Sequence, residues 1–179
     1  ELRELGAGAI LAVGTGSANP PRLIRMRYRP NGGSDTPDRV IGLVGKCITF
    51  DSGGYSIKTY EGMLHMKGDM AGGAAVLGAM SALPALGCPV AVDATITGAI
   101  VVALGEGATG LFASDDRLAN ALLAAASTVG ERTWRMPLFE ELEDKIRGEV
   151  GDVKNSGGRG GGAITAALFL RRFSEGLPW

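Results

Sequence analysis

Apolar and β-branched residues gather in short runs separated by glycine, proline and polar turns. Residues 40–44 (VIGLV) form one such run, which continues through residues 48–50. A short apolar run bounded by turn signals favours a buried strand. Residues 22–29 (RLIRMRYR) alternate charged and apolar side chains, which predicts a strand with one solvated face.

Other segments follow the same alternation of strand and helix. Residues 1–6 predict a short amphipathic helix and residues 9–13 a buried strand. Residues 90–105 predict a strand, a tight turn and a helix. Apolar residues at helical spacing predict the remaining helices, over residues 69–83, 117–127, 134–155 and 163–173. Interleaved strands and helices are typical of an α/β domain.

Composition narrows the functional classes. The chain has 179 residues, 45% of them hydrophobic, which is enough for one sizeable core. Charged residues make up 21% and the net charge is −1, so no nucleic-acid or acidic-membrane partner is indicated. Cys47 and Cys88 give no disulfide framework, which indicates a reducing, cytoplasmic setting. No apolar run is long enough to span a bilayer, and the opening residues do not form a signal peptide.

Candidate chemistry lies where the central strand ends. Lys46, Asp51, Lys58 and Asp69 are separated by apolar, glycine and serine residues rather than by further charge. A lysine in an apolar strand is unfavourable unless its charge is compensated or its proton is lost. Residues 52–54 (SGG) then turn the chain, because glycine tolerates positive φ and close backbone approach. The two carboxylates and two lysines therefore predict a site.

Plainer roles account for other polar residues. Asp115 and Asp116 precede a predicted helix and fit an N-cap and a first-turn charge better than a metal pair. Asp69, taken alone, also suits a helix N-cap. The single histidine, His65, gives almost no support for a histidine-based metal cluster or a Ser-His-Asp triad. The acidic residues of the segment 140–143 predict a solvated helix face.

The stretch GKCITFDSGGYSIK (residues 45–58), followed by GM, MKGDM and GGAAVLGAM, resembles the leucyl aminopeptidase family of two-metal exopeptidases. The resemblance implies a three-layer α/β domain with a central mixed, mostly parallel sheet flanked by helices. It also implies that Lys46, Asp51 and Asp69 are metal ligands and that Lys58 is catalytic, polarising the scissile carbonyl. Cys47 stands where the family usually has glycine.

Further expectations follow from the resemblance. The family binds two divalent ions, Zn²⁺ or Mn²⁺ with Mg²⁺ as a further candidate, and it assembles as a homohexamer in the cytoplasm. Its substrates are peptides with a free amino terminus. Met66 would line the pocket for the first side chain, and the backbone at Thr95, Ile96 and Gly98 would contact the substrate. Neither a membrane nor a nucleic acid is expected as a partner.

One family signature is absent. The sequence Asn-Thr-Asp-Ala-Glu-Gly-Arg, which supplies two more carboxylate ligands and an arginine that holds a bicarbonate, does not occur in the chain. Compared with the family, the sequence jumps near Val90–Ala91 to a strand normally found well downstream. We therefore interpret residues 1–179 as an incomplete metallo-aminopeptidase catalytic domain that lacks this segment and the family's amino-terminal domain.

This absence shapes the functional expectation. Two divalent cations carry four positive charges, whereas Asp51 and Asp69 supply two negative ones. We expect a metal-dependent aminopeptidase whose chain, as written, binds one metal at most and has little or no activity. Either the sequence joins parts of a longer chain, which we favour, or the deletion is real. In the second case the chain is an inactive relative, acting as an oligomeric scaffold or DNA-binding accessory protein. A generic nucleotide-binding domain is disfavoured because no phosphate loop has the required spacing.

Overall fold

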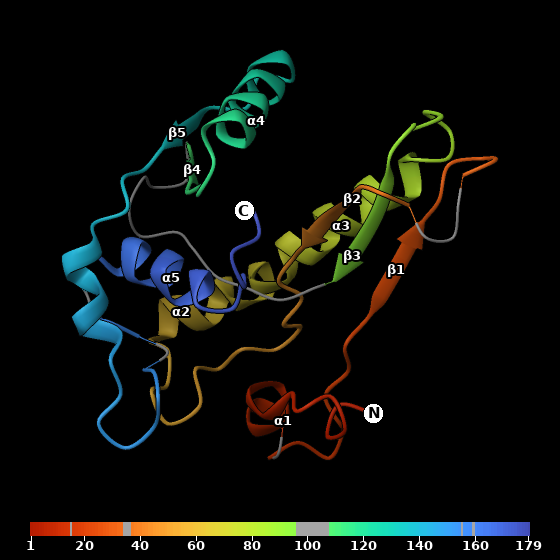
Figure 1. Cartoon of the computed structure of the whole chain (residues 1–179). Coiled ribbons are helices and arrows are strands. Elements are labelled where there is room, and N and C mark those ends of the chain that lie inside the picture. Colours follow the sequence, from red (N-terminus) through yellow and green to blue (C-terminus); the bar gives the residue numbers. More distant parts are fainter. Residues whose placement is uncertain (15, 34–36, 96–107, 155, 159) are drawn as a thin grey trace. The chain divides into compact units, whose positions relative to one another are not determined.

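A computed structural model describes the chain except for residues 15, 34–36, 96–107, 155 and 159 (Figure 1). The chain divides into two compact units, Glu1–Gly98 and Ala99–Trp179. We call them the amino-terminal and carboxy-terminal units and describe each by itself. No helix within the described ranges is both long and apolar enough to cross a membrane.

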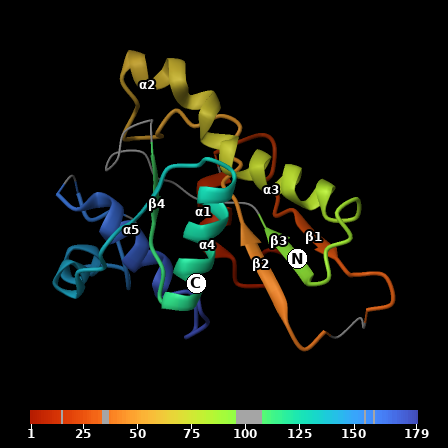
Figure 2. The same cartoon turned by 90° about the horizontal axis from the view of Figure 1, so that it is seen from above.

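The amino-terminal unit contains a mixed three-stranded sheet. Its strands are β1 (Arg25–Tyr28), β2 (Val40–Val44) and β3 (Ala91–Thr95), in the order β1-β3-β2. β3 runs antiparallel to β1 and parallel to β2 (Figure 2). Helix α3 (Ala71–Ala82) contacts β2 and β3. The core between helix and sheet is formed by Met80, Val92 and Ala94, with Met26, Tyr28, Leu43, Val76 and Leu83 packed around them.

Strand β1 confirms the prediction of one solvated face. Met26 and Tyr28 pack against the core, whereas the neighbouring arginines are exposed. Arg25 donates a hydrogen bond to Asp93 of β3 at 3.0 Å, and the Nε atom of Arg27 lies 3.8 Å from the same carboxylate. The period-two pattern of the sequence indicated which side chains of β1 face the core and which face solvent.

Three predictions for this unit are wrong. Residues 9–13 belong to helix α1 (Gly8–Gly14), and residues 1–6 form turns. A five-residue apolar run has too little length for its periodicity to separate strand from helix. β2 ends at Val44, so Lys46 lies in a loop, and within the described residues the strand pairs with β3 alone and is mostly exposed rather than buried. Pairing between distant segments decides this exposure, and a local pattern does not contain that information.

The carboxy-terminal unit begins with a parallel strand pair. β4 (Thr109–Leu111) and β5 (Thr133–Arg135) are connected by helix α4 (Asp116–Thr128). Asp115 is the N-cap of α4, and its carboxylate accepts a hydrogen bond from the backbone N–H of Leu118 at 2.9 Å. The predicted capping role of Asp115 is therefore confirmed, and the adjacent Asp116 lies in the first turn.

The rest of this unit packs η3 (Glu140–Ile146), a 3₁₀ helix, against helix α5 (Gly162–Arg171). Buried Ile146, Ile164 and Leu168 form the core between them. The predicted helix over residues 134–155 is thus much shorter, because Pro137 cannot donate within a helix and glycines follow at 148 and 151. The predicted apolar helix after the glycine loop is confirmed. Both units combine helices with sheets, as the predicted α/β class requires.

Candidate active site

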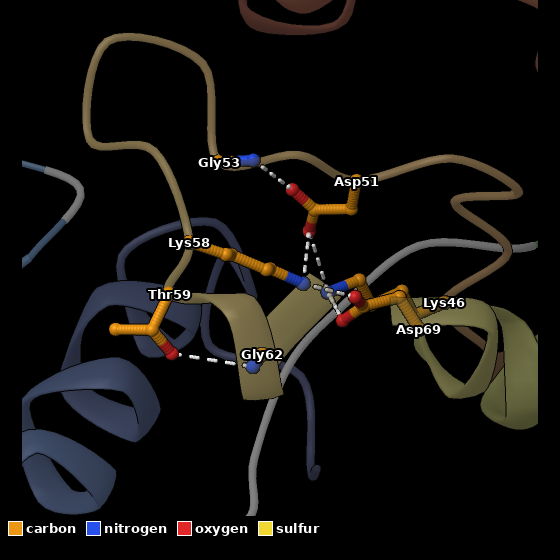
Figure 3. Close-up of polar contacts among 7 residues, drawn as sticks. All are labelled: Lys46, Asp51, Gly53, Lys58, Thr59, Gly62 and Asp69. Atoms are coloured by element: carbon orange, nitrogen blue, oxygen red, sulfur yellow. Dashed lines mark hydrogen bonds and ion pairs between the residues drawn. The ribbon is translucent and has the colours of Figure 1, made fainter. Parts of the chain in front are cut away.

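Lys46, Asp51, Lys58 and Asp69 come together in the amino-terminal unit (Figure 3). The Nζ atom of Lys46 lies 2.7 Å from Asp69 Oδ1 and 3.5 Å from Asp51 Oδ2. The Nζ atom of Lys58 donates a hydrogen bond to Asp69 Oδ2 and lies 3.7 Å from Asp51 Oδ2. Exposed fractions of these side chains run from 17% for Lys46 to 29% for Asp51. We call this group the loop cluster.

Two glycines bring Lys46 to the start of α3. A Cβ atom on Gly45 would lie 2.4 Å from the carbonyl oxygen of Gly72. A Cβ atom on Gly72 would lie 3.0 Å from the backbone nitrogen of Lys46. The Gly73 N–H donates to the carbonyl of Lys46 at 2.5 Å. The loop and the first turn of α3 are therefore in backbone contact, which glycine alone permits.

Asp51 is held by the turn that follows it. Its Oδ1 accepts the backbone N–H of Gly53 at 3.0 Å, which leaves Oδ2 facing the two lysines. Gly53 has φ +91°, and a Cβ atom there would meet the carbonyl oxygen of Ser56 at 2.3 Å. The N–H of Lys58 donates to the carbonyl of Ser52 at 2.8 Å and closes the loop. The prediction of a glycine turn with positive φ is confirmed at Gly53.

Lys58 and Asp69 are positioned by helix α2 (Tyr60–His65) and by η1 (Met66–Met70), which is a 3₁₀ helix. Thr59 caps α2 by accepting the N–H of Gly62 at 3.2 Å, so Lys58 stands at the entrance of the helix. Asp69 belongs to η1. The N-cap of α3 is Met70 and makes no side-chain capping bond, so Asp69 is free of the N-cap role considered above and faces the lysines instead.

The electrostatics of the cluster follow from this geometry. Hydrogen bonds from Lys46 and then Lys58 hold the pKa of the Asp69 carboxyl below its ordinary value, and their combined effect outweighs the opposing effect of burial. The hydrogen bond to Asp69 raises the pKa of Lys58 above its ordinary value. Two ammonium groups thus share one carboxylate, with Asp51 as the second anion. In this arrangement the four charges balance one another.

The remaining predicted residues lie in different places. Met66 is the half-buried first residue of η1, three positions before Asp69. Thr95 ends β3, and its carbonyl accepts the N–H of Gly45 at 2.7 Å, which places it beside the loop that carries Lys46. Ile96 and Gly98 lie outside the described residues. His65 is exposed at the end of α2.

The donor set limits what the cluster can hold. Two carboxylates and one neutral amine suit a single divalent cation, since carboxylate oxygens and nitrogen donors both bind such ions. Within the described residues, no group of three or more His, Cys, Asp or Glu side chains is placed to share a metal. A two-metal centre would need further carboxylates.

The model of the cytosol aminopeptidase family, catalytic domain, matches residues 1–96 and 92–179, which together cover the chain. The chain belongs to this family. The two matched ranges share residues 92–96, so β3 lies where both matches meet.

Curated relatives agree with this assignment. A probable cytosol aminopeptidase of Solibacter usitatus is 40% identical over 238 residues, covering 99% of this chain and 49% of the relative. One of Methylorubrum extorquens is 37% identical, covering 99% of this chain and 48% of the relative. The chain therefore spans about half the length of the curated relatives it matches. The S. usitatus relative is about 60 residues longer than this chain over the matched stretch.

Solved structures show the same fold. The bottromycin maturation enzyme BotP in complex with Mn is 34% identical with a TM-score of 0.86, covering 99% of this chain and 52% of that one. The cytosol aminopeptidase from Coxiella burnetii is 32% identical with a TM-score of 0.82, covering 96% of this chain and 50% of that one. The predicted fold family is confirmed.

Proposed function

We propose that this chain is part of the catalytic domain of a metal-dependent aminopeptidase that hydrolyses peptides at a free amino terminus. The observation that carries the proposal is the loop cluster, in which two carboxylates and two lysines from separate segments converge, at 2.7 Å between Lys46 and Asp69. Family membership and the names of the relatives support the reaction class. The same names support the cytoplasmic setting expected from the two free cysteines.

Each member of the cluster has a proposed role. Asp51, Asp69 and Lys46, the last as a neutral amine, would hold a divalent cation, Zn²⁺ or Mn²⁺ with Mg²⁺ as a further candidate. When bound, such an ion supplies Lewis acidity and an activated water. Lys58 stays protonated and donates a hydrogen bond to the scissile carbonyl as negative charge develops on its oxygen. The raised pKa of Lys58 is consistent with this role.

Substrate contacts extend the proposal beyond the cluster. Met66 would line the pocket for the first side chain, and it stands in η1 close to Asp69 in the sequence. Thr95, Ile96 and Gly98 would contact the peptide through their backbones. The position of Thr95 beside Gly45 supports its assignment. A homohexamer is the proposed assembly, on the basis of the family resemblance.

We further propose that the 179-residue chain lacks a segment that completes the site. The greater length of the S. usitatus relative over the matched stretch and the meeting of both family matches at residues 92–96 support a junction close to Val90–Ala91. This segment would supply the carboxylates that bind the second cation. It would also supply the arginine that holds the bicarbonate. The chain alone then binds one ion and hydrolyses little peptide.

Isothermal titration calorimetry with MnCl₂ tests the metal site. The chain should bind one Mn²⁺, and Asp69→Asn should weaken binding at least tenfold because a charged ligand is lost. Asp144→Asn is the matched control, since Asp144 is an exposed carboxylate of η3 in the other unit, and it should bind as the unmodified chain does. Equal affinities for Asp69→Asn and the control would reject the assignment.

A chimera tests the reaction. Inserting the corresponding segment of the S. usitatus relative between Val90 and Ala91 should yield hydrolysis of leucine p-nitroanilide. Lys58→Gln in the chimera should lower kcat by roughly 100-fold or more, as for other groups that stabilise an oxyanion. Lys67→Gln, an exposed lysine of η1, serves as control. A folded, metal-loaded chimera without hydrolysis would contradict the proposal.

A second candidate is an inactive relative that acts as an oligomeric scaffold or a DNA-binding accessory protein. It is favoured by the lack of a third carboxylate beside Asp51 and Asp69 in the described part of the chain. This function predicts no Mn²⁺ binding and either a stable high-order oligomer or duplex-DNA binding that weakens with salt. The net charge of −1 argues against the DNA alternative.

A further inference from the structure

Lys58 occupies carboxylate oxygens that the proposed metal site would use. Its Nζ atom donates a hydrogen bond to Asp69 Oδ2 and lies 3.7 Å from Asp51 Oδ2 (Figure 3). Lys46 donates to the other oxygen of Asp69 at 2.7 Å. The backbone N–H of Gly53 donates to the other oxygen of Asp51 at 3.0 Å. All four carboxylate oxygens of the loop cluster therefore have a partner within the chain, and a cation that uses Asp69 must displace one of them.

The backbone around Lys58 is held in place, so its side chain is the part that can leave. The N–H of Lys58 donates to the carbonyl of Ser52 at 2.8 Å, and Thr59 caps α2 by accepting the N–H of Gly62 at 3.2 Å. The Lys58 side chain is 26% exposed, and its four-carbon stem is flexible. A change of rotamer would move the ammonium group from Asp69 toward solvent without breaking these backbone bonds.

We propose that Lys58 is an internal counter-cation that competes with a divalent cation for Oδ2 of Asp69. This inference rests on the metal site proposed above, and it adds that the charge of Lys58 lowers the affinity of that site. Lys46 does not have this role, because its nitrogen is itself one of the proposed ligands. The side chain that we assign to catalysis would thus also regulate how tightly the metal is held.

The charge balance of the loop cluster supports competition. Two carboxylates and two ammonium groups give a net charge of zero, and the four side chains are only 17–29% exposed. Replacing Lys58 by a neutral side chain leaves a net charge of −1 and frees Asp69 Oδ2. An ammonium group a few ångströms from a divalent cation opposes its binding, and this repulsion is larger where solvent screens the charges incompletely.

A purely structural role for Lys58 predicts the opposite sign. If the hydrogen bond from Lys58 served only to hold Asp69 in place as a ligand, its loss would loosen that ligand and weaken metal binding. Competition predicts instead that loss of the Lys58 charge strengthens binding. The sign of the change in metal affinity therefore separates the two roles.

Isothermal titration calorimetry with MnCl₂ at one fixed pH tests the inference on the 179-residue chain. Lys58→Met removes the charge and keeps most of the stem, so it should bind Mn²⁺ roughly tenfold more tightly, as expected when one nearby like charge is removed. Lys58→Arg keeps the charge and should bind no more tightly than the unmodified chain. Lys67→Met is the matched control. Lys67 is an exposed lysine of η1, two positions before Asp69, and its solvated charge should leave the affinity nearly unchanged when removed.

The pattern across these variants decides the outcome. Tighter binding by Lys58→Met alone supports the inference, and so does binding that is measurable only in that variant. Equal or weaker binding by Lys58→Met overturns it while leaving the proposed metal site intact. The same gain in Lys58→Arg or in Lys67→Met also overturns it, because the charge at position 58 would then not be the cause. Absence of Mn²⁺ binding in every variant would reject the proposed metal site itself, and this inference with it.

A measurement on the unmodified chain keeps the test decisive if Lys58→Met fails to fold. In ¹H–¹⁵N spectra of lysine ammonium groups, the Lys58 signal, assigned through Lys58→Arg, should exchange slowly with water because of its hydrogen bond to Asp69. Diamagnetic Zn²⁺ should raise its exchange rate to that of the exposed Lys67. A Lys58 ammonium group that keeps its slow exchange at saturating Zn²⁺ would overturn the inference.

Discussion

Each unit contains a cluster of two acidic and two basic side chains, yet the two clusters are built differently. In the carboxy-terminal unit, Glu140 and Glu143 of η3 pair with Arg171 of α5 and with the following Arg172. We call this group the helix cluster. Arg171 donates to both carboxylate oxygens of Glu140, one of these bonds at 2.6 Å, and to Glu143 at 3.1 Å. The loop cluster has no such two-pronged contact.

What lies beneath each cluster explains the difference. Buried Ile146 and Leu168 pack between η3 and α5, so the helix cluster adds to an apolar contact that already joins the two elements. In contrast, α2 and η1 contribute no fully buried residue among those described. The loop cluster is therefore positioned by its own charges and by glycine backbone contacts. The helix cluster, by contrast, lies over a core that joins η3 to α5.

The largest effect should come from the core under the helix cluster. Leu168 is fully buried, so Leu168→Ala should lower the free energy of unfolding by about 2–5 kcal/mol through lost burial and a cavity. Urea denaturation followed by circular dichroism measures it. Leu170→Ala, two positions along α5 and 55% exposed, should have little effect. Similar losses of unfolding free energy for both variants would contradict the view that a buried apolar core underlies the helix cluster.

A local effect is expected in the loop cluster without metal. Asp69→Asn leaves Lys46 and Lys58 with Asp51 as the remaining anion, at 3.5 and 3.7 Å. The amide of Lys58, which closes the loop onto Ser52, should exchange about tenfold faster, the scale of one lost hydrogen bond to a charged group. The unfolding midpoint should move less than with Leu168→Ala. A large drop in global stability would show that the cluster supports the fold.

Much of this architecture was predictable because its signals are local. The alternation in β1, the Asp115 cap and the apolar helix α5 each depend on neighbouring residues. The membership of the loop cluster came from motif spacing and family resemblance, and its four residues converge in the structure. The glycine turn predicted at residues 52–54 is found at Gly53, where φ is positive. The roles in metal binding and catalysis that we assign to the four residues of the loop cluster remain predictions.

The failures involve contacts between distant segments. Nothing local in VIGLV shows that β2 pairs with β3 alone among the strands that the structure describes. The acids of η3 include exposed Glu140 and Glu141, in keeping with the predicted solvated face. The sequence pattern did not show that Glu140 and Glu143 pair with Arg171, 31 and 28 residues away. Long-range pairing of this kind leaves no periodic signal in the sequence.

Replacing Arg171 by lysine separates the contribution of the guanidinium shape from that of its charge, and we expect a smaller effect on stability. Lysine keeps the charge but cannot bind both oxygens of Glu140 at once. Arg171→Lys should lower the thermal midpoint by a few degrees at most, because Glu140 is 65% exposed. Arg172→Lys is the matched control, since Arg172 contacts Glu143 alone among the two acids. A drop as large as that of Leu168→Ala would mean that the ion pairs, rather than the apolar contact, join η3 to α5.

The smallest expected effect is the pH response of Glu140. The hydrogen bond from Arg171 holds the pKa of this carboxyl below its ordinary value of 4.5. A carboxyl whose pKa is lowered by folding stabilises the protein above its unfolded pKa, and this contribution disappears as the pH falls through the folded pKa. NMR titration of the Glu140 side-chain carbon should therefore give a midpoint below 4.5, and Arg171→Met should return it toward that value. An unchanged Glu140 midpoint in Arg171→Met would mean that the guanidinium does not hold the carboxylate in solution, and the helix cluster would then owe its geometry to the apolar core alone.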